Sequence, residues 1–414
     1  MSKVLELLRS FQTAVSTADF WSGFRPDAVP LAVYDGSHTY LCNHPSPPSS
    51  FRALSEDGIW ISLGRLPGVV ANSVACIEGV DTATAFYLEQ QVNINGLVAL
   101  LAHEAFHVYQ RSHFRGKNAN EASLFLYPVT DARLLAQRRL ETYALAKALA
   151  AEKVNEIHWL CAALHYRELR FSEMDREFVS YERAIERYEG TATYIECQCA
   201  GKAPYLPPEG FKAVKVRQRG YQTGAALCFF LNDLLGNWQA KLESGKSLDE
   251  LLKQALDSSP EDKHVTEQQA SAVLRQAEDD VRQLLQSRRE ALADFAAFNG
   301  YKLTLIAADW SLLKVEGFDP LNVEVIDKDV LHKRYLKLVT PSGSLEVIDT
   351  SALTQSQSEH PLFGGVQSVT INSEDKFALT EFDGKMSIVS SKVNGHLKCE
   401  VKELTEDSFV LKVF

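Results

Sequence analysis

The sequence has no run of 18 apolar residues, so we expect no transmembrane helix. Its start, MSKVLELLRSFQTAVSTADF, has the spacing of an amphipathic helix and lacks the continuous apolar stretch and cleavage site of a secretory signal. Basic residues are outnumbered, with 43 Lys and Arg against 54 Asp and Glu, which gives a net charge of −11. This balance argues against nucleic acid or an anionic membrane surface as the main partner. We therefore expect a cytoplasmic protein.

The sequence also lacks a clear cysteine motif. The seven cysteines are an odd number and are scattered, apart from Cys197 and Cys199 in the stretch CQC. Buried free thiols in a reducing compartment are the expected state. Cys197 and Cys199 are possible metal ligands, but two cysteines at this spacing with no second pair are a weak signal.

Glycine and proline are absent between Pro128 and Gly190, where Ala, Leu, Glu and Arg dominate, and this composition predicts long packed helices. Strand-like runs come before this region, and short β runs separated by turns follow it. We predict an α+β protein in three parts. They are an N-terminal α/β lobe (1–92), a helical lobe (93–298) and an all-β sandwich or barrel (299–414).

One apolar helix carries a chemical motif. In GLVALLAHEAFHVYQRSH, residues 96–113, the apolar run is followed by His103, Glu104 and His107. Positions i and i+4 share one face of a helix, so the two imidazoles can reach a single metal ion. Glu104 is rotated by roughly 100° and can act as a general base on a bound water. The alternative is that the histidines only fill a core.

A catalytic zinc commonly needs a third protein ligand, and the chain offers two candidates. His113 has the outer spacing of the metzincins, but Gln110 replaces the Gly that lets the chain turn back in that group, so His113 would point away. Glu189 lies on a later predicted helix, where Gly190 would allow another helix or a substrate to approach closely. Its alternative is a solvated charge. Glu196, two turns further on, could support a ligand histidine from outside.

His103, Glu104, His107 and Glu189 together resemble the gluzincin metallopeptidases, the thermolysin-like group that includes many zinc aminopeptidases. The order of a small β-containing lobe before a helical lobe also fits, over roughly residues 30–260. The resemblance implies a zincin-like catalytic domain, one Zn²⁺ held by His103, His107 and Glu189, and hydrolysis of a peptide or protein substrate.

Within this resemblance, Tyr221 and Gly224 match a Tyr-x-x-Gly pattern whose Tyr donates to the oxyanion, and a packing role for Tyr221 is the alternative. Two signatures are missing. There is no Gly-x-Met-Glu-Asn, and Tyr188 and Thr193 stand where Asn-Glu-x-x-x-Asp would need Asn and Asp. No subfamily is therefore assigned, and endopeptidase and aminopeptidase activity both stay open.

Two further expectations concern the surroundings of the site. Residues 82–90, TATAFYLEQ, are expected to form an edge strand that pairs with substrate, and the Pro-rich loop 43–51 is expected to cover the cleft. The competing hypothesis is a non-catalytic binding or scaffold protein with a structural metal. Such a site should be closed by a fourth protein ligand, such as His113 or a cysteine.

Overall fold

The computed structural model divides into two compact units, Met1–Glu278 and Asp279–Phe414. The first unit combines a sheet with helices and the second is formed mainly of strands, so the predicted α+β class is confirmed. The structure describes residues 3–54, 58–66, 69, 71–87, 93–116, 118–256, 265–320 and 322–414. Among them, no helix is long and apolar enough to cross a membrane.

The sheet of the first unit has six strands in the order β3-β4-β2-β1-β6-β5. These are β1 (Leu31–Tyr34), β2 (His38–Cys42), β3 (Arg52–Ala53), β4 (Ile59–Leu63), β5 (Ser73–Ile77) and β6 (Val80–Phe86). Because side chains alternate along a strand, Leu31 and Val33 face the core shared with α1 and α2, whereas Ala32 faces a second apolar cluster.

Strand β6 lies inside this sheet. It pairs in parallel with β1 and antiparallel with β5. The expectation that residues 82–90 form a substrate-binding edge is therefore wrong for the described part of that segment, because its backbone groups already pair with two neighbours. Residues 88–90 lie outside the described part of the chain. The edge strand next to β6 is β5.

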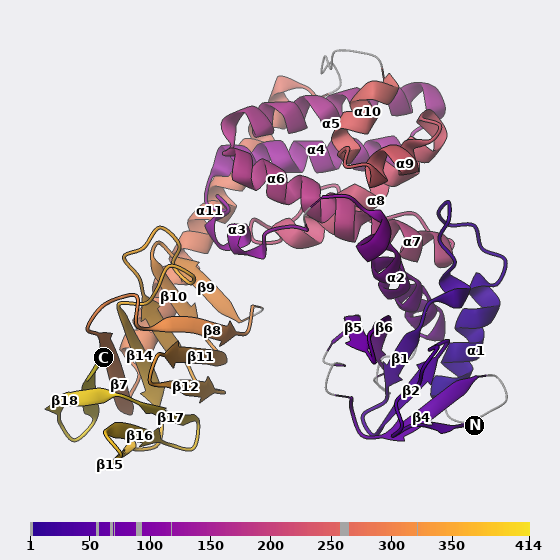
Figure 1. The fold of residues 1–414 in the computed structure, drawn as a ribbon. Coiled ribbons are helices and arrows are strands. Elements are labelled where there is room, and N and C mark those ends of the chain that lie inside the picture. Colours follow the sequence, from indigo (N-terminus) through magenta and orange to yellow (C-terminus); the bar gives the residue numbers. More distant parts are fainter. Residues whose placement is uncertain are drawn as a thin grey trace. The chain divides into compact units, whose positions relative to one another are not determined.

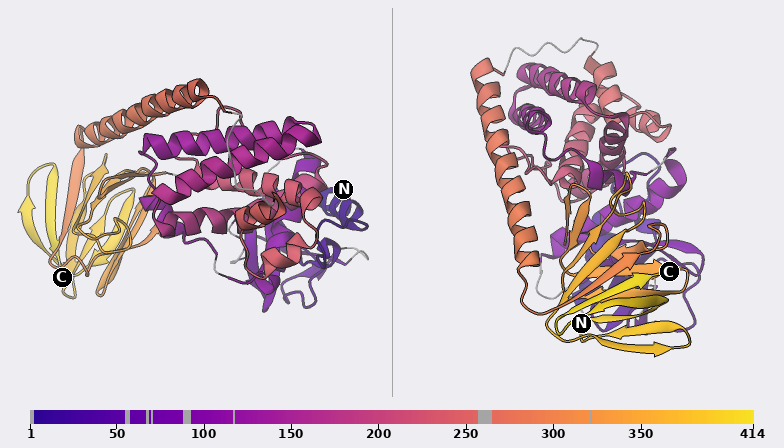
Figure 2. Two further views of the ribbon diagram at one scale, coloured as in Figure 1. Left: turned by 90° about the horizontal axis from the view of Figure 1, so that it is seen from above. Right: turned by 90° about the vertical axis from the view of Figure 1, so that its left-hand side faces the viewer.

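Helices make up the rest of the first unit, and Figure 1 shows α4, α5 and α6 lying side by side. The helical segments are α1 (Lys3–Val15), η1 (Pro26–Ala28), α2 (Ile94–His113), α3 (Glu121–Leu126), α4 (Ala132–Ala150), α5 (Lys153–Glu173), α6 (Arg176–Ile185), η2 (Glu186–Gly190), α7 (Thr191–Cys199), α8 (Val216–Leu234), α9 (Trp238–Glu243), α10 (Leu248–Leu256) and α11 (Glu267–Ala296). The division between the units falls within α11, which Figure 2 shows as one long helix.

The second unit contains two open sheets, ordered β18-β19-β7-β14-β13-β10-β9 and β15-β16-β17-β12-β11-β8. Their strands are β7 (Tyr301–Ala307), β8 (Lys314–Phe318), β9 (Val323–Ile326), β10 (Asp329–His332), β11 (Tyr335–Thr340), β12 (Gly343–Ile348), β13 (Ala352–Gln355), β14 (Ser368–Ser373), β15 (Ala378–Phe382), β16 (Lys385–Val389), β17 (Val393–Leu397), β18 (Cys399–Leu404) and β19 (Ser408–Val413). Leu303 of β7 and Leu336 of β11 belong to one apolar core, so the two sheets pack on each other as in a sandwich.

Candidate metal centre

Helix α2 places the two histidines of the motif side by side. It is preceded by Asn93, whose side chain accepts a hydrogen bond from the Gly96 N–H (3.3 Å) and so caps the helix. His103 and His107 are both buried, and their Nε2 atoms lie 3.1 Å apart. The spacing of one helical turn therefore brings the two imidazoles to one point, as the sequence predicts.

Glu189 joins this pair from another part of the chain. Its Oε2 lies 3.6 Å from Nε2 of His103 and 3.4 Å from Nε2 of His107. The carboxylate is buried, and one donor atom from each of the three residues lies within 4.8 Å of the others. We call these three residues the metal cluster, because their donor atoms could hold a metal ion.

Each member of the metal cluster has a partner on its outer side. Gln110 Oε1 lies 2.6 Å from Nδ1 of His107, and Arg217 donates to Oε1 of Glu189 at 2.8 Å. Glu196 Oε2 lies 3.3 Å from Nδ1 of His103, although this contact lacks hydrogen-bond geometry. Such partners fix the direction of ligand side chains. The expected supporting position of Glu196 is thus observed.

Gln110 also determines the tautomer of His107. Its amide nitrogen donates to the Tyr188 carbonyl (2.8 Å) and to Thr191 Oγ1 (2.7 Å), so its oxygen is the atom left to face His107. Nδ1 of His107 must then carry a proton and donate a hydrogen bond to Gln110, so Nε2 is the nitrogen that faces the centre of the metal cluster and can bind a metal there.

The convergence of acceptors requires a positive charge at the centre. Burial would lower the pKa of His103, but the nearby carboxylates of Glu189 and Glu196 outweigh burial and raise it to about 9. Burial would raise the pKa of Glu189, but the two histidines hold it well below its usual range. Without a metal, a proton on His103 supplies the charge. A metal ion can take the place of that proton, so the donor set fits a bound metal.

Glu104 and Tyr221 lie beside the metal cluster rather than in it. Glu104 is buried, and burial is the main cause that raises the pKa of its carboxyl. The Tyr221 ring on α8 lies nearly parallel to that of His103, with ring centroids 6.3 Å apart. Burial, and then the charge of Glu189, raise the pKa of Tyr221 far above its usual value, so its hydroxyl keeps its proton.

The glycines near these residues allow a close helix contact. A Cβ on Gly190 would lie 2.6 Å from the Gly224 Cα, and one on Gly224 would lie 2.6 Å from the Glu186 carbonyl oxygen. Both distances are shorter than real Cβ contacts, so the π-helical turn η2 and α8 can approach only where both side chains are missing. The close approach expected at Gly190 is therefore confirmed, and it explains Gly224 through packing.

His113 and the cysteines stay apart from this group. Nδ1 of His113 lies 2.9 Å from the Tyr109 carbonyl oxygen, and its ring stacks on Tyr109. Cys197 and Cys199 are free thiols. Over the residues that the structure describes, the metal cluster thus has three members and no fourth protein ligand.

A set of charged side chains meets in the interior of the first unit, and sequence reasoning missed it. Six of them, which we call the buried ion network, are at most 3% exposed: Glu141, Arg167, Arg170, Glu182, Glu186 and Arg219. Their helices are recognisable from the sequence, but nothing in one sequence shows which charges on different helices meet. The only hint was charged residues at positions that a helical pattern would assign to the core.

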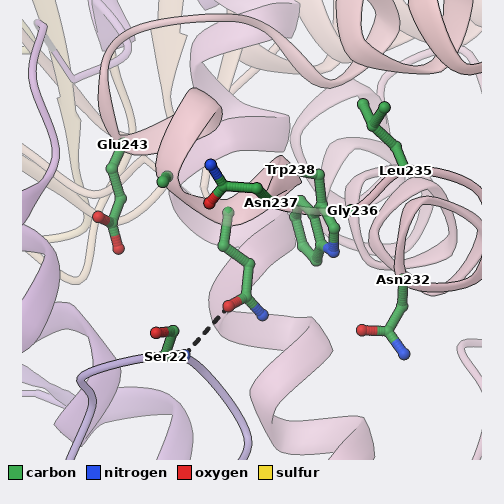
Figure 3. A pocket seen from close by; sticks show the side chains of 9 residues that line it. Ser22, Asn232, Leu235, Gly236, Asn237, Trp238 and Glu243 are labelled. Carbon is green, nitrogen blue, oxygen red and sulfur yellow. Dashed lines mark hydrogen bonds between the residues drawn. The ribbon is translucent and has the colours of Figure 1, made fainter.

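Loop 43–51 contacts the sheet of the first unit, and its expected position over the cleft stays a prediction, whereas a separate hollow is formed mainly by residues 232–243. In loop 43–51, Nε2 of His44 lies 3.0 Å from the Ile77 carbonyl oxygen of β5, and Phe51 is buried. A hollow of about 440 Å³ is lined by Trp238 and Glu243, among others (Figure 3). Glu243 accepts hydrogen bonds there from Trp21 and Tyr109. No member of the metal cluster lines this hollow.

Comparisons with models of protein families, with curated proteins and with solved structures find no match for this chain.

Proposed function

We propose that the protein is a zinc-dependent peptidase that hydrolyses peptide bonds in a peptide or protein substrate. The observation that carries this proposal is the metal cluster, in which two imidazoles and one carboxylate converge beside a buried Glu104. Two nitrogen donors and one oxygen donor suit Zn²⁺, and three protein ligands leave a position for water. The resemblance to gluzincins points in the same direction.

A Zn²⁺ ion held by His103, His107 and Glu189 would lower the pKa of a bound water to about 7 and polarise the substrate carbonyl. Glu104 takes a proton from the attacking water as the oxygen bonds to the carbonyl carbon. When the carbon–nitrogen bond breaks, Glu104 passes that proton to the leaving amine. Tyr221 keeps its proton and can donate a hydrogen bond to the oxygen on which negative charge develops.

The competing hypothesis, a scaffold with a structural metal, requires a closed site. It would need a fourth protein ligand, and the described residues provide three.

If a substrate chain pairs with the sheet, β5 offers an edge to it, and β6 does not. Arg111, one turn after His107, donates to the Val74 carbonyl at 3.2 Å and so links β5 to the motif helix.

A digest of a peptide library with mass-spectrometric readout tests the activity. Wild type should cut, Glu104→Gln should lose nearly all cleavage, and Glu209→Gln, a change at an exposed carboxylate, should cut like wild type. Internal cuts would indicate an endopeptidase, and stepwise loss from the amino end an aminopeptidase. Cleavage by Glu104→Gln at the wild-type rate would refute the mechanism.

A further inference from the structure

The buried ion network joins five helical segments of the first unit. Its three glutamates and three arginines balance in formal charge, and they come from α4, α5, α6, η2 and α8. Arg167 binds two partners at once, since its guanidinium donates to Glu141 (2.9 and 2.6 Å) and to Glu186 (2.7 and 2.6 Å). Paired guanidinium–carboxylate contacts of this kind fix direction as well as distance.

Glu186 is the member of the buried ion network that lies in the π-helical turn η2. Both of its carboxylate oxygens accept from Arg167, and Oε1 also accepts from the Thr223 hydroxyl at 2.7 Å. The residue is 1% exposed, so its carboxylate relies on these donors rather than on bulk solvent. Glu186 is therefore held from both α5 and α8.

The same short turn also carries the metal ligand Glu189. A π-helical turn is wound more loosely than an α-helix, so side chains three residues apart diverge further around the axis. This divergence lets Glu186 reach the buried ion network while Glu189 reaches the histidines. Such turns are rare and often occur at functional sites, and here the Gly190–Gly224 contact fits the turn closely against α8.

We propose that Glu186 is a positioning residue for the metal centre: its bonds to Arg167 and Thr223 hold the π-helical turn that presents Glu189 to the two histidines. The proposal rests on the metal site of the proposed function, and it does not require peptidase activity. It explains why the turn that carries the metal ligand Glu189 also binds the fully buried guanidinium of Arg167.

Glu182 provides a matched comparison within the same network. It lies four residues earlier, in α6, and is 3% exposed. It accepts from Arg170 (2.6 Å), Arg219 (3.2 Å) and Tyr127 (2.5 Å), so its burial and number of partners resemble those of Glu186. It lies outside the π-helical turn. A merely structural network would make the two glutamates equivalent for metal binding.

The test compares Glu186→Gln with Glu182→Gln by competition for Zn²⁺ with a chromophoric chelator and by the visible spectrum of the Co²⁺-loaded proteins. Both variants should lose thermal stability. Glu186→Gln should bind Zn²⁺ about ten-fold more weakly than Glu182→Gln, in the range seen for outer partners of metal ligands, and its Co²⁺ spectrum should change. Equal Zn²⁺ affinities of the two variants, with unchanged Co²⁺ spectra, would overturn the proposal.

A second pair of variants decides the question if Glu186→Gln does not fold. Thr223→Val removes one hydrogen bond to Glu186 and no charge, and Thr142→Val makes the same change at an equally buried threonine that contacts Arg219 instead. Only Thr223→Val should weaken Zn²⁺ binding, and equal affinities would again contradict the proposal. Wild-type protein that binds no Zn²⁺ would refute the proposed function itself, which separates the two failures.

Discussion

The two units of this protein differ in what they bury. Over the described residues, the first unit buries the metal cluster and the buried ion network, whereas the buried polar side chains of the second unit are uncharged at neutral pH. Those of the second unit are His332, Thr354, Ser356, Asn372 and Ser373. Burying an ion pair costs several kcal/mol of desolvation per ion, so it is poor evidence for stability. Fixing geometry is the role that we propose for Glu186, and the buried ion network adjoins the candidate site through the π-helical turn η2.

The largest effect on stability is expected from a substitution that breaks the buried ion network. Arg170 is fully buried and bonds to Glu141 and Glu182, so Arg170→Met leaves both carboxylates short of a partner. We expect a loss of about 3–5 kcal/mol in the stability of the first unit. Hydrogen exchange with mass spectrometry reports the units separately, and strands β7–β19 should keep wild-type protection. An equal loss of protection in both units would contradict the difference between them described above.

A catalytic effect should likewise be confined to the first unit. Tyr221→Phe keeps the ring beside His103 and removes the hydroxyl, and kcat should fall about 100-fold, or about 3 kcal/mol of barrier, while Zn²⁺ content stays unchanged. The control is Tyr335→Phe in the second unit, which loses a hydrogen bond to Glu346. An unchanged kcat for Tyr221→Phe would assign that side chain to packing alone.

Acid should affect the two units in different pH ranges. Burial lowers the pKa of His332 to about 4, below the usual 6.5, so the unfolded second unit binds a proton that the folded one resists. The contribution of His332 to the free energy of unfolding is therefore fully present above pH 6.5. It is lost as the pH falls toward 4, by about 2 kcal/mol between pH 7 and 4.5. In the first unit, burial would raise the pKa of Glu141, but the arginines around it, Arg167 first, lower it to about 2 from 4.5. Its contribution is lost only between pH 4.5 and 2.

Denaturant titrations of wild type and His332→Gln, followed by hydrogen exchange in β10 and β13, check this prediction. The variant should show no pH dependence from this position between pH 7 and 4.5. If wild type and variant lose stability in parallel, another group is responsible.

The smallest expected effect is on Zn²⁺ affinity, and it compares two buried glutamines within the first unit. Gln110→Ala removes the acceptor for His107 Nδ1, and Zn²⁺ affinity should fall about ten-fold, at the lower end for such partners. Gln137→Ala, at a buried glutamine of α4 outside the metal cluster, should leave the affinity unchanged. Competition with a chelator measures both, and equal affinities would deny Gln110 an orienting role.

The sequence predicted the local parts of this picture and missed the long-range ones. His103 and His107 meet because they lie one turn apart, and Asn93 caps their helix, so both followed from helix geometry. Glu189 was a candidate because it lies on a later helix beside Gly190, and its role as a ligand was supported through a family resemblance. Gln110 was recognised as a residue that continues the helix, but its bonds to Tyr188 and Thr191 depend on how α2 packs against α7 and the π-helical turn.

Because one sequence shows local geometry and not long-range packing, it also failed to predict several other features of the structure. Apolar residues recur every three or four positions through residues 178–199, as in a single α-helix, because a π-helical turn adds no distinctive residue to this pattern. Residues 82–86 have strand character, but single-sequence patterning does not show that β5 pairs on their outer side. Arg167 and Glu186 were visible as charges on helices, and their meeting depends on tertiary packing alone.

Metal analysis of protein purified without added metal tests the central claim most directly. Wild type and Glu104→Gln should each contain about one zinc ion per chain, because Glu104 is not a ligand, and His107→Ala should lose it. Folded wild-type protein without stoichiometric metal, or a His107→Ala variant that keeps its metal, would contradict the account.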